Sequence, residues 1–158
     1  MIGILTALAL ILSYVESLIP AFFAVPGMKL GLTNLVVLTA LYILNVPGAL
    51  AINLVRILLV SLLFGNAASL SYSLAGGLLS FAVMYVLKRS DRFSPVTVSV
   101  AGGVFHNIGQ ILVAMLLLGT SYLAWYLVIL WFTGIAAGAL IGLIGGIIIK
   151  RLKNAVKK

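Results

Sequence analysis

Long apolar segments run through the whole sequence, separated by short breaks that contain proline, glycine or polar residues. Most segments are close to the roughly 20 residues that a helix needs to cross a bilayer. We predict six of them, at residues 2–19, 32–45, 47–64, 69–87, 95–119 and within 122–149. The pattern indicates an all-α membrane protein, with six transmembrane helices in a compact bundle that forms one domain over residues 1–158.

The breaks also predict where helices begin and end. The second segment is short and stops before Pro47, and both Pro47 and Pro95 suit the first turn of the helix that follows. The sixth segment is longer than a span requires. We therefore expect it to be tilted, or to begin with an interfacial turn that carries Tyr122, Trp125 and Tyr126.

Composition supports a membrane location. Hydrophobic residues make up 64% of the chain and charged residues only 8%, against about 25% charged residues in soluble domains. Because a chain this short has no interior large enough to cover such segments, lipid must cover them. The absence of cysteine excludes disulfides and thiolate metal sites.

The basic residues gather at helix ends. Eight of the ten lysines and arginines lie either between the fourth and fifth segments or at the C-terminus. They are Lys88, Arg89, Arg92, Lys150, Arg151, Lys153, Lys157 and Lys158. Since basic residues favour the cytoplasmic side, we expect both termini in the cytoplasm, a plasma-membrane location, and an outward-facing loop at residues 20–31. No aromatic residues are interleaved with the basic ones, so nucleic acid is not an expected partner.

Three ionisable residues fall within predicted spans: Glu16, Arg56 and His106. Each costs about 2.5–3.5 kcal/mol in the bilayer and so needs a partner or a function. A rise of about 1.5 Å per residue puts Arg56 and His106 at one depth, with Glu16 within reach of the arginine. Two interpretations stay open for Arg56, which follows Asn53 by one turn. It could form a buried ion pair with Glu16, or it could offer its donors to a ligand.

The fifth segment carries the densest polar pattern. Ser99, Gly103, His106 and Gln110 fall on one stripe at helical spacing, and Asn107 borders it. We interpret the stripe as a polar wall that binds a ligand head group. The alternative is hydrogen bonding between helices that fixes the bundle.

Small residues form a different stripe on the sixth segment, with glycine at positions 134, 138, 142 and 146. Such spacing allows helix backbones to approach closely, so we expect packing rather than chemistry. Gly3 with Ala7, and Gly76 with Ser80, permit similar contacts, either within the bundle or with a partner protein.

Catalytic chemistry has little support. The chain contains two acidic residues, Glu16 and Asp91, and one histidine. These cannot supply a metal site or the acidic ligands that hold magnesium and diphosphate. No nucleotide-binding loop is present either. We expect no enzymatic activity, no cofactor and no ATP motor within the chain.

Four stretches carry a resemblance to a known family. They are Val25–Asn34 (VPGMKLGLTN), Arg56–Gly65 (RILLVSLLFG), Tyr72–Ser80 (YSLAGGLLS) and Gly102–Gln110 (GGVFHNIGQ). The chain resembles the membrane proteins called heptaprenyl diphosphate synthase component I, or Gx transporters. That family is in turn similar in size and layout to the substrate-binding S components of energy-coupling-factor (ECF) vitamin transporters.

The resemblance implies a six-helix bundle with an outward pocket capped by residues 20–31. It also implies a separate membrane coupling subunit and two ATPases as the motor, with Gly3 and Ala7 facing the coupling subunit. Tyr72, within the third stretch, joins the candidates for ligand binding.

The leading hypothesis is a substrate-binding subunit of a small-molecule importer. The ligand would meet Lys29 and Asn34 near the outer loop, and then deeper polar side chains. An arginine and amides among aliphatic residues would suit an isoprenoid, a quinone precursor or a vitamin-like compound. The full candidate set is Glu16, Lys29, Asn34, Asn53, Arg56, Tyr72, His106, Asn107 and Gln110.

An alternative assigns no ligand to these residues. The chain would then be a noncatalytic membrane subunit of a polyprenyl diphosphate synthase or of a flavin- or quinone-linked electron-transfer complex. A channel is a weaker third option, because few polar groups are available to line a pore.

Overall fold

The computed structural model describes residues 1–18 and 31–156, and all regular structure in these ranges is helical. The elements in chain order are α1 (Ile2–Leu18), α2 (Asn34–Ile43), α3 (Val46–Phe64), α4 (Ala67–Arg89), α5 (Pro95–Leu118), the 3-10 turn η1 (Tyr122–Trp125) and α6 (Tyr126–Val156). The prediction of an all-α fold is confirmed.

Four of the predicted spans have the length and hydropathy to cross a membrane. They are α3, α4, α5 and the continuous segment formed by η1 and α6. The apolar helices α1 and α2 are shorter, with 17 and 10 residues. At a rise of about 1.5 Å per residue, α2 extends only about half of a ~30 Å hydrocarbon core.

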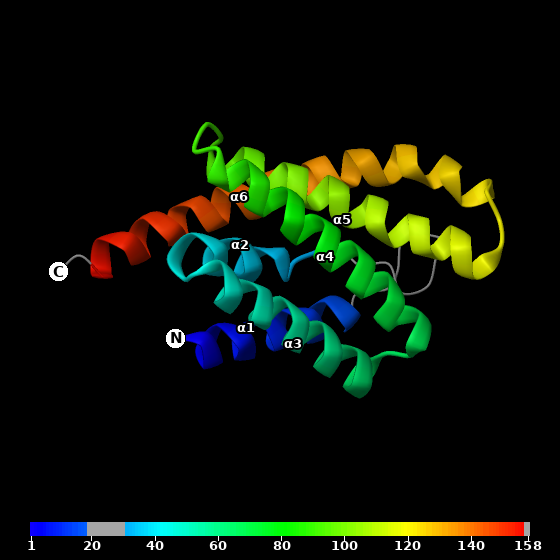
Figure 1. The fold of residues 1–158 in the computed structure, drawn as a ribbon, viewed down its shortest axis with the longest axis horizontal. Coiled ribbons are helices and arrows are strands. Elements are labelled where there is room, and N and C mark those ends of the chain that lie inside the picture. The colour runs from blue at the N-terminus through cyan, green and yellow to red at the C-terminus, as the bar shows by residue number, and fades with distance from the viewer. Residues whose placement is uncertain (19–30, 157–158) are drawn as a thin grey trace.

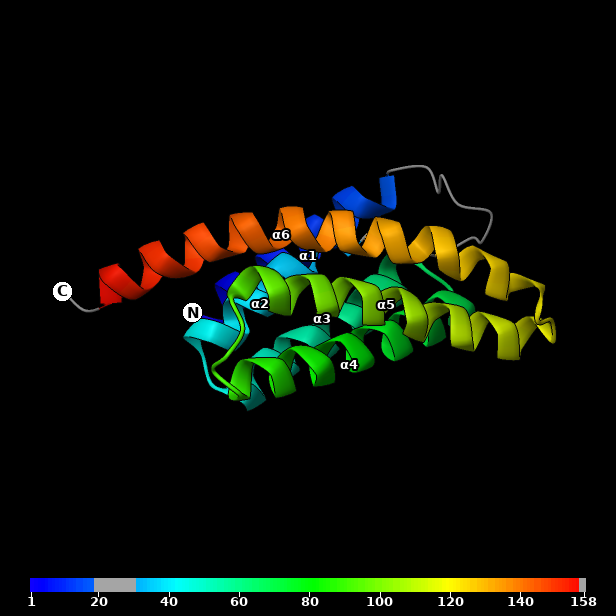
Figure 2. The same cartoon turned by 90° about the horizontal axis from the view of Figure 1, so that it is seen from above.

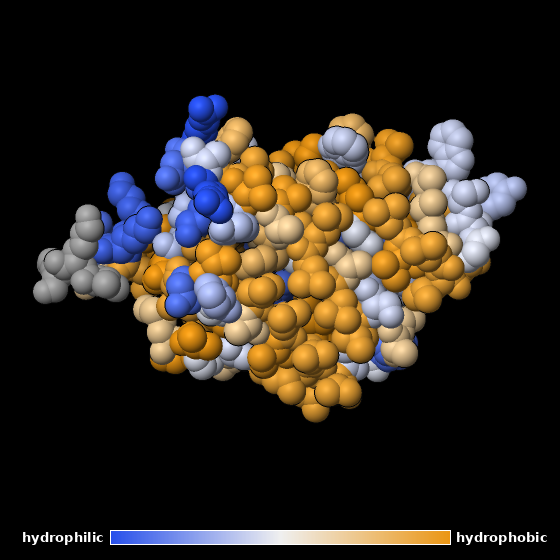
Figure 3. Space-filling view, in the orientation of Figure 1, coloured by the Kyte–Doolittle hydropathy of each residue, from blue (hydrophilic) through white to orange (hydrophobic). Residues whose placement is uncertain are grey.

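The long helices run side by side between two ends of the bundle (Figures 1 and 2). The start of α1, the α2–α3 and α4–α5 connections and the end of α6 lie at one end, while the α3–α4 and α5–η1 connections lie at the other. The basic residues in the last turn of α4, in the connection after it and on the last turns of α6 therefore lie at the same end, as expected from their sequence positions. Figure 3 shows hydrophilic side chains gathered there and a mostly hydrophobic surface elsewhere.

Helix starts follow local capping chemistry. Pro47 and Pro95 lie in the first turns of α3 and α5, as predicted. Three side chains ahead of helices accept hydrogen bonds from backbone N–H groups of the first turn. These pairs are Asn45 with Gly48 at 2.9 Å, Asn66 with Ser69 at 2.8 Å and Ser94 with Thr97 at 3.2 Å.

Three predicted boundaries were wrong. The second helix is Asn34–Ile43 rather than 32–45, because Leu44 and Asn45 are extended ahead of α3. The fourth begins earlier, at Ala67, because Asn66 caps it. The sixth continues past Ile149 to Val156, carrying the basic residues on its final turns.

The predicted glycine stripe on α6 is largely a packing surface against α5. A Cβ atom at Gly138 would lie 2.7 Å from Val100 Cα, and one at Gly142 would lie 2.7 Å from Val96 Cα. Gly146 does not belong to this surface, since a Cβ there would have no atom within 4 Å. Gly145 packs against a different helix, because its Cβ would lie 2.9 Å from the Leu38 side chain of α2.

Candidate functional site

Polar side chains from separate helices meet around the first residues of α2. Glu16 comes from the last turn of α1, while Asn53 and Arg56 come from the middle of α3. Thr33 and Asn34 lie at the start of α2. All five side chains are buried, so the N-terminal end of this short helix lies inside the bundle rather than at its surface.

The Glu16 carboxylate binds the backbone that leads into α2. It accepts hydrogen bonds from the N–H groups of Gly31 and Leu32, the latter at 3.3 Å, and from the Thr33 hydroxyl at 3.4 Å. Gly31 has a φ of +86°, a conformation that favours glycine. Backbone N–H groups at a helix start lack partners within the helix and attract negative charge. Glu16 therefore satisfies this buried helix end.

The Arg56 guanidinium is held on one side by Asn53 and on another by Thr33. Its Nε and Nη2 donate to Asn53 Oδ1 at 3.1 and 2.9 Å, and its Nη1 donates to Thr33 Oγ1 at 3.0 Å. Three of the five guanidinium N–H donors thus have partners among the described residues. The ion pair between Glu16 and Arg56, one of the two interpretations of Arg56, is indirect, because the Thr33 hydroxyl lies between the two charged groups.

Glycines 76 and 77 of α4 connect this cluster to α5. Asn53 Nδ2 donates to the Gly77 carbonyl at 3.0 Å. A Cβ atom at Gly76 would lie 2.8 Å from both Gln110 Cγ and the His106 carbonyl oxygen. Because Gly76 has no side chain, His106 and Gln110 of α5 can lie close to α4.

His106 also approaches the start of α2. A Cβ atom at Gly31 would lie 3.1 Å from Asn34 Nδ2 and 4.0 Å from His106 Cδ2. These contacts form a chain through the bundle. Glu16 and Arg56 meet at Thr33, and Asn53 joins Arg56 to Gly77. His106 lies near Asn34, and His106 and Gln110 lie beside Gly76.

The Gln110 side chain is buried, yet its amide makes no hydrogen bond with the described residues. It is 1% exposed, and neither atom of its amide has a hydrogen-bond partner among residues 1–18 and 31–156. Buried amides are normally satisfied, because leaving one unpaired costs about 1–3 kcal/mol. Together with the further Arg56 donors, this amide offers hydrogen-bonding capacity at the buried cluster.

The predicted α5 stripe divides into two faces. Gly103 packs on α6, where its Cβ would lie 2.6 Å from the Gly134 carbonyl oxygen. Asn107 faces the same way and donates to the Leu130 carbonyl at 2.8 Å. For Asn107 the structure thus shows hydrogen bonding between helices, whereas His106 and Gln110 turn toward α4.

Two other candidates lie apart from the cluster or outside the described residues. Tyr72 packs in an apolar cluster with Ile111, Ala114 and Leu130. Lys29 lies outside the described residues, as does most of the predicted cap at residues 20–31.

Sequence reasoning missed Thr33, the residue that joins the two charged side chains. Ser13, also buried, lies 3.3 Å from the same hydroxyl. The available signal was a hydroxyl residue directly before Asn34, within the predicted second span, although its side chain makes no capping hydrogen bond in the structure.

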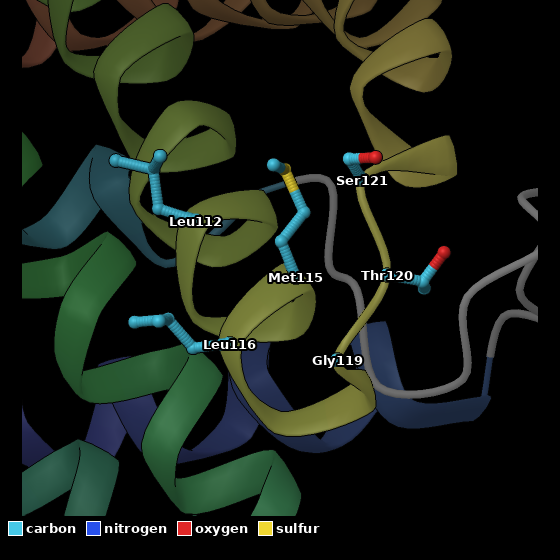
Figure 4. A pocket seen from close by; sticks show the side chains of 6 residues that line it. All are labelled: Leu112, Met115, Leu116, Gly119, Thr120 and Ser121. Carbon is cyan, nitrogen blue, oxygen red and sulfur yellow. The ribbon is translucent and has the colours of Figure 1, made fainter.

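A surface cavity of about 620 Å³ lies at the far end of α5. Its lining consists of Leu112, Met115, Leu116, Gly119, Thr120 and Ser121 (Figure 4). Since no charged side chain lines it and Leu112 and Leu116 are exposed, we assign it to the lipid-facing surface rather than to the polar cluster.

Comparison with known proteins identifies the family. The family model described as Heptaprenyl diphosphate synthase component I matches residues 5–148. The chain belongs to this family. The match includes the residues of every helix that form the polar cluster, and it confirms the resemblance to the component I family inferred from the sequence. No curated protein and no solved structure matches the chain.

Proposed function

We propose that this protein is the substrate-binding membrane subunit of a small-molecule importer, similar to an S component of an ECF transporter. The observation that carries the proposal is the burial of Arg56, His106 and Gln110 on α3 and α5, which both pack against glycines 76 and 77 of α4, with the Gln110 amide unpaired among the described residues. Polar groups inside a membrane bundle are expensive and generally mark a functional site.

The cluster has chemistry that suits a polar head group. Arg56 can donate from two further N–H groups, and the Gln110 amide can both donate and accept. Because Glu16 balances the charge of Arg56, a neutral head group rich in oxygen would be accommodated without adding charge. The surrounding aliphatic side chains suit the apolar part of an isoprenoid, a quinone precursor or a vitamin-like compound.

The proposal includes a membrane topology. The helices α1 and α2 would lie within the bilayer beside the four longer ones, so that the chain passes six times with both termini in the cytoplasm. The motor would be a separate coupling subunit with two ATPases, and this chain would carry no catalysis.

Native mass spectrometry of gently extracted protein tests the binding role. We expect a co-purifying small molecule that is lost in Gln110→Leu, while the thermal unfolding temperature stays unchanged or rises because an unpaired buried amide has been removed. Asn107→Leu is the matched control on the same helix. It should lower the unfolding temperature and retain the ligand, and equal ligand retention in both variants would contradict the proposal.

A second function is favoured by the family description itself. The chain would be a noncatalytic membrane partner of a prenyl diphosphate synthase, and the polar cluster would only fix the helices. Affinity purification of the tagged protein from its native membrane distinguishes the two. A stoichiometric synthase subunit and no small molecule would favour this second function.

A further inference from the structure

The outer face of α4 carries an apolar groove close to the basic end of the bundle. Its volume is about 230 Å³, and its lining consists of Ala82, Val83, Val86 and Leu87. Val86 is 64% exposed, so the groove opens on the surface rather than into the core. A hydrocarbon chain fits such a lining, whereas a polar ligand would find no hydrogen-bonding group there.

A cationic side chain lies directly beyond this groove on the same helix face. Arg89 follows Val86 by three residues and Ala82 by seven, a spacing that repeats one face of a helix. Its Nη1 donates to the Tyr85 hydroxyl at 3.3 Å. This is the single hydrogen bond that the described residues give the guanidinium, so most of its donors remain available. Arg92 follows in the exposed connection to α5.

The neighbouring lysine has a different role. Lys88 turns toward α2, where its Nζ donates to the Leu41 carbonyl and lies 5.4 Å from the centre of the Tyr42 ring. Lys153 of α6 approaches the same ring at 5.7 Å. A cation suits the negative C-terminal end of a helix such as α2. Lys88 is thus bound to a neighbouring helix, whereas the Arg89 hydrogen bond stays within α4.

We propose that the Ala82–Arg89 face of α4 is a binding site for an acidic phospholipid. One acyl chain would lie in the groove, and the phosphate would bind Arg89 with support from Arg92. An arginine fork matches a phosphate oxygen pair, and the position of the guanidinium at the end of an apolar helix places it at head-group level. The proposal is independent of the ligand site at the start of α2.

Lipid titration followed by native mass spectrometry tests this site. The probes are palmitoyl-oleoyl phosphatidylglycerol and the corresponding phosphatidylcholine, added to delipidated protein in detergent. We expect the first bound phosphatidylglycerol to be retained preferentially. Arg89→Gln should weaken its binding by about fivefold, the effect of one interfacial cation. Equal binding of both lipids by the unmodified protein would overturn the proposal without any variant.

Two controls separate a defined site from general attraction to a basic surface. Arg151→Gln removes the same charge from an exposed position on α6 and should change binding by less than about twofold. Ala82→Phe should fill the groove and lower phosphatidylglycerol binding with Arg89 intact, whereas Leu116→Phe on the exposed surface of α5 should not. Equal losses in the two arginine variants, or no loss in Ala82→Phe, would contradict the assigned site.

Discussion

Arg56 and Glu16, which carry opposite charges and are both buried in the bundle, are joined through one hydroxyl group. Thr33 Oγ1 accepts from Arg56 Nη1 at 3.0 Å and donates to Glu16 Oε2 at 3.4 Å. The carboxylate is thereby free to bind the backbone ahead of α2, and the guanidinium keeps donors that a direct bidentate pair would have used. The Thr33 hydroxyl thus connects α1, α2 and α3 inside the bundle, where Glu16, Thr33 and Arg56 are all buried.

Removing the Thr33 hydroxyl should destabilise the protein. Thr33→Val keeps the shape of the side chain but leaves two buried charged groups without their shared partner, so we expect a loss of about 1–3 kcal/mol in unfolding free energy. Denaturation of the purified protein in mixed micelles measures it. Thr33→Ser, which keeps the hydroxyl, should retain most of the stability of the unmodified protein. Thr6→Val, at an exposed hydroxyl on α1 that donates to the Ile2 carbonyl, should have little effect.

The charges of Glu16 and Arg56 should be energetically coupled despite their indirect contact. Each of Glu16→Gln and Arg56→Met leaves one buried charge unbalanced, at an expected cost of about 3–5 kcal/mol. The double variant leaves none, so its loss should be smaller than the sum of the two. A double-mutant cycle on unfolding free energies measures this difference. Additive losses would show that the two charges act independently.

Sequence reasoning located most of the polar cluster because depth in a membrane bundle follows from simple counting. Pro47 and Pro95 fix where α3 and α5 begin, and a constant rise then puts Arg56 and His106 at one level. The position of Thr33 could not be derived in this way. It depends on how the chain returns into the bundle after α1, and residue periodicity carries no information on that path.

The α5 stripe shows a second limit of pattern reasoning. At 100° per residue, Gly103 lies about 40° from Asn107 and about 60° from His106 around the helix, so all three fit one broad face. Only the position of α6 decides how that face divides. The glycines of α6 let Gly103 and Asn107 pack against that helix, whereas His106 and Gln110 pack against α4.

This division predicts a stability effect specific to Asn107. Its amide bonds the Leu130 carbonyl across the α5–α6 contact, and such bonds in membrane bundles average about 0.6 kcal/mol with a maximum near 1.7. We expect Asn107→Ala to lower unfolding free energy by an amount in this range. Ser99→Ala, at a buried hydroxyl with no hydrogen-bond partner among the described residues, should cost less. A larger loss in Ser99→Ala would contradict the assignment.

The glycines of α6 should differ sharply from one another on substitution. Gly138→Ala would place a methyl group 2.7 Å from Val100 Cα and 2.9 Å from the Ser99 carbonyl oxygen. Because both contacts are backbone atoms, the helices must separate, and we expect a loss above about 2 kcal/mol in unfolding free energy. Gly146 lies eight residues further along the same helix, and a Cβ atom there would have no atom within 4 Å. Gly146→Ala should be neutral, or stabilising by up to about 1 kcal/mol through higher helix propensity. Thermal and micellar unfolding of the two variants side by side provides the measurement, and similar losses in both would show that close contact with α5 does not hold α6 in place.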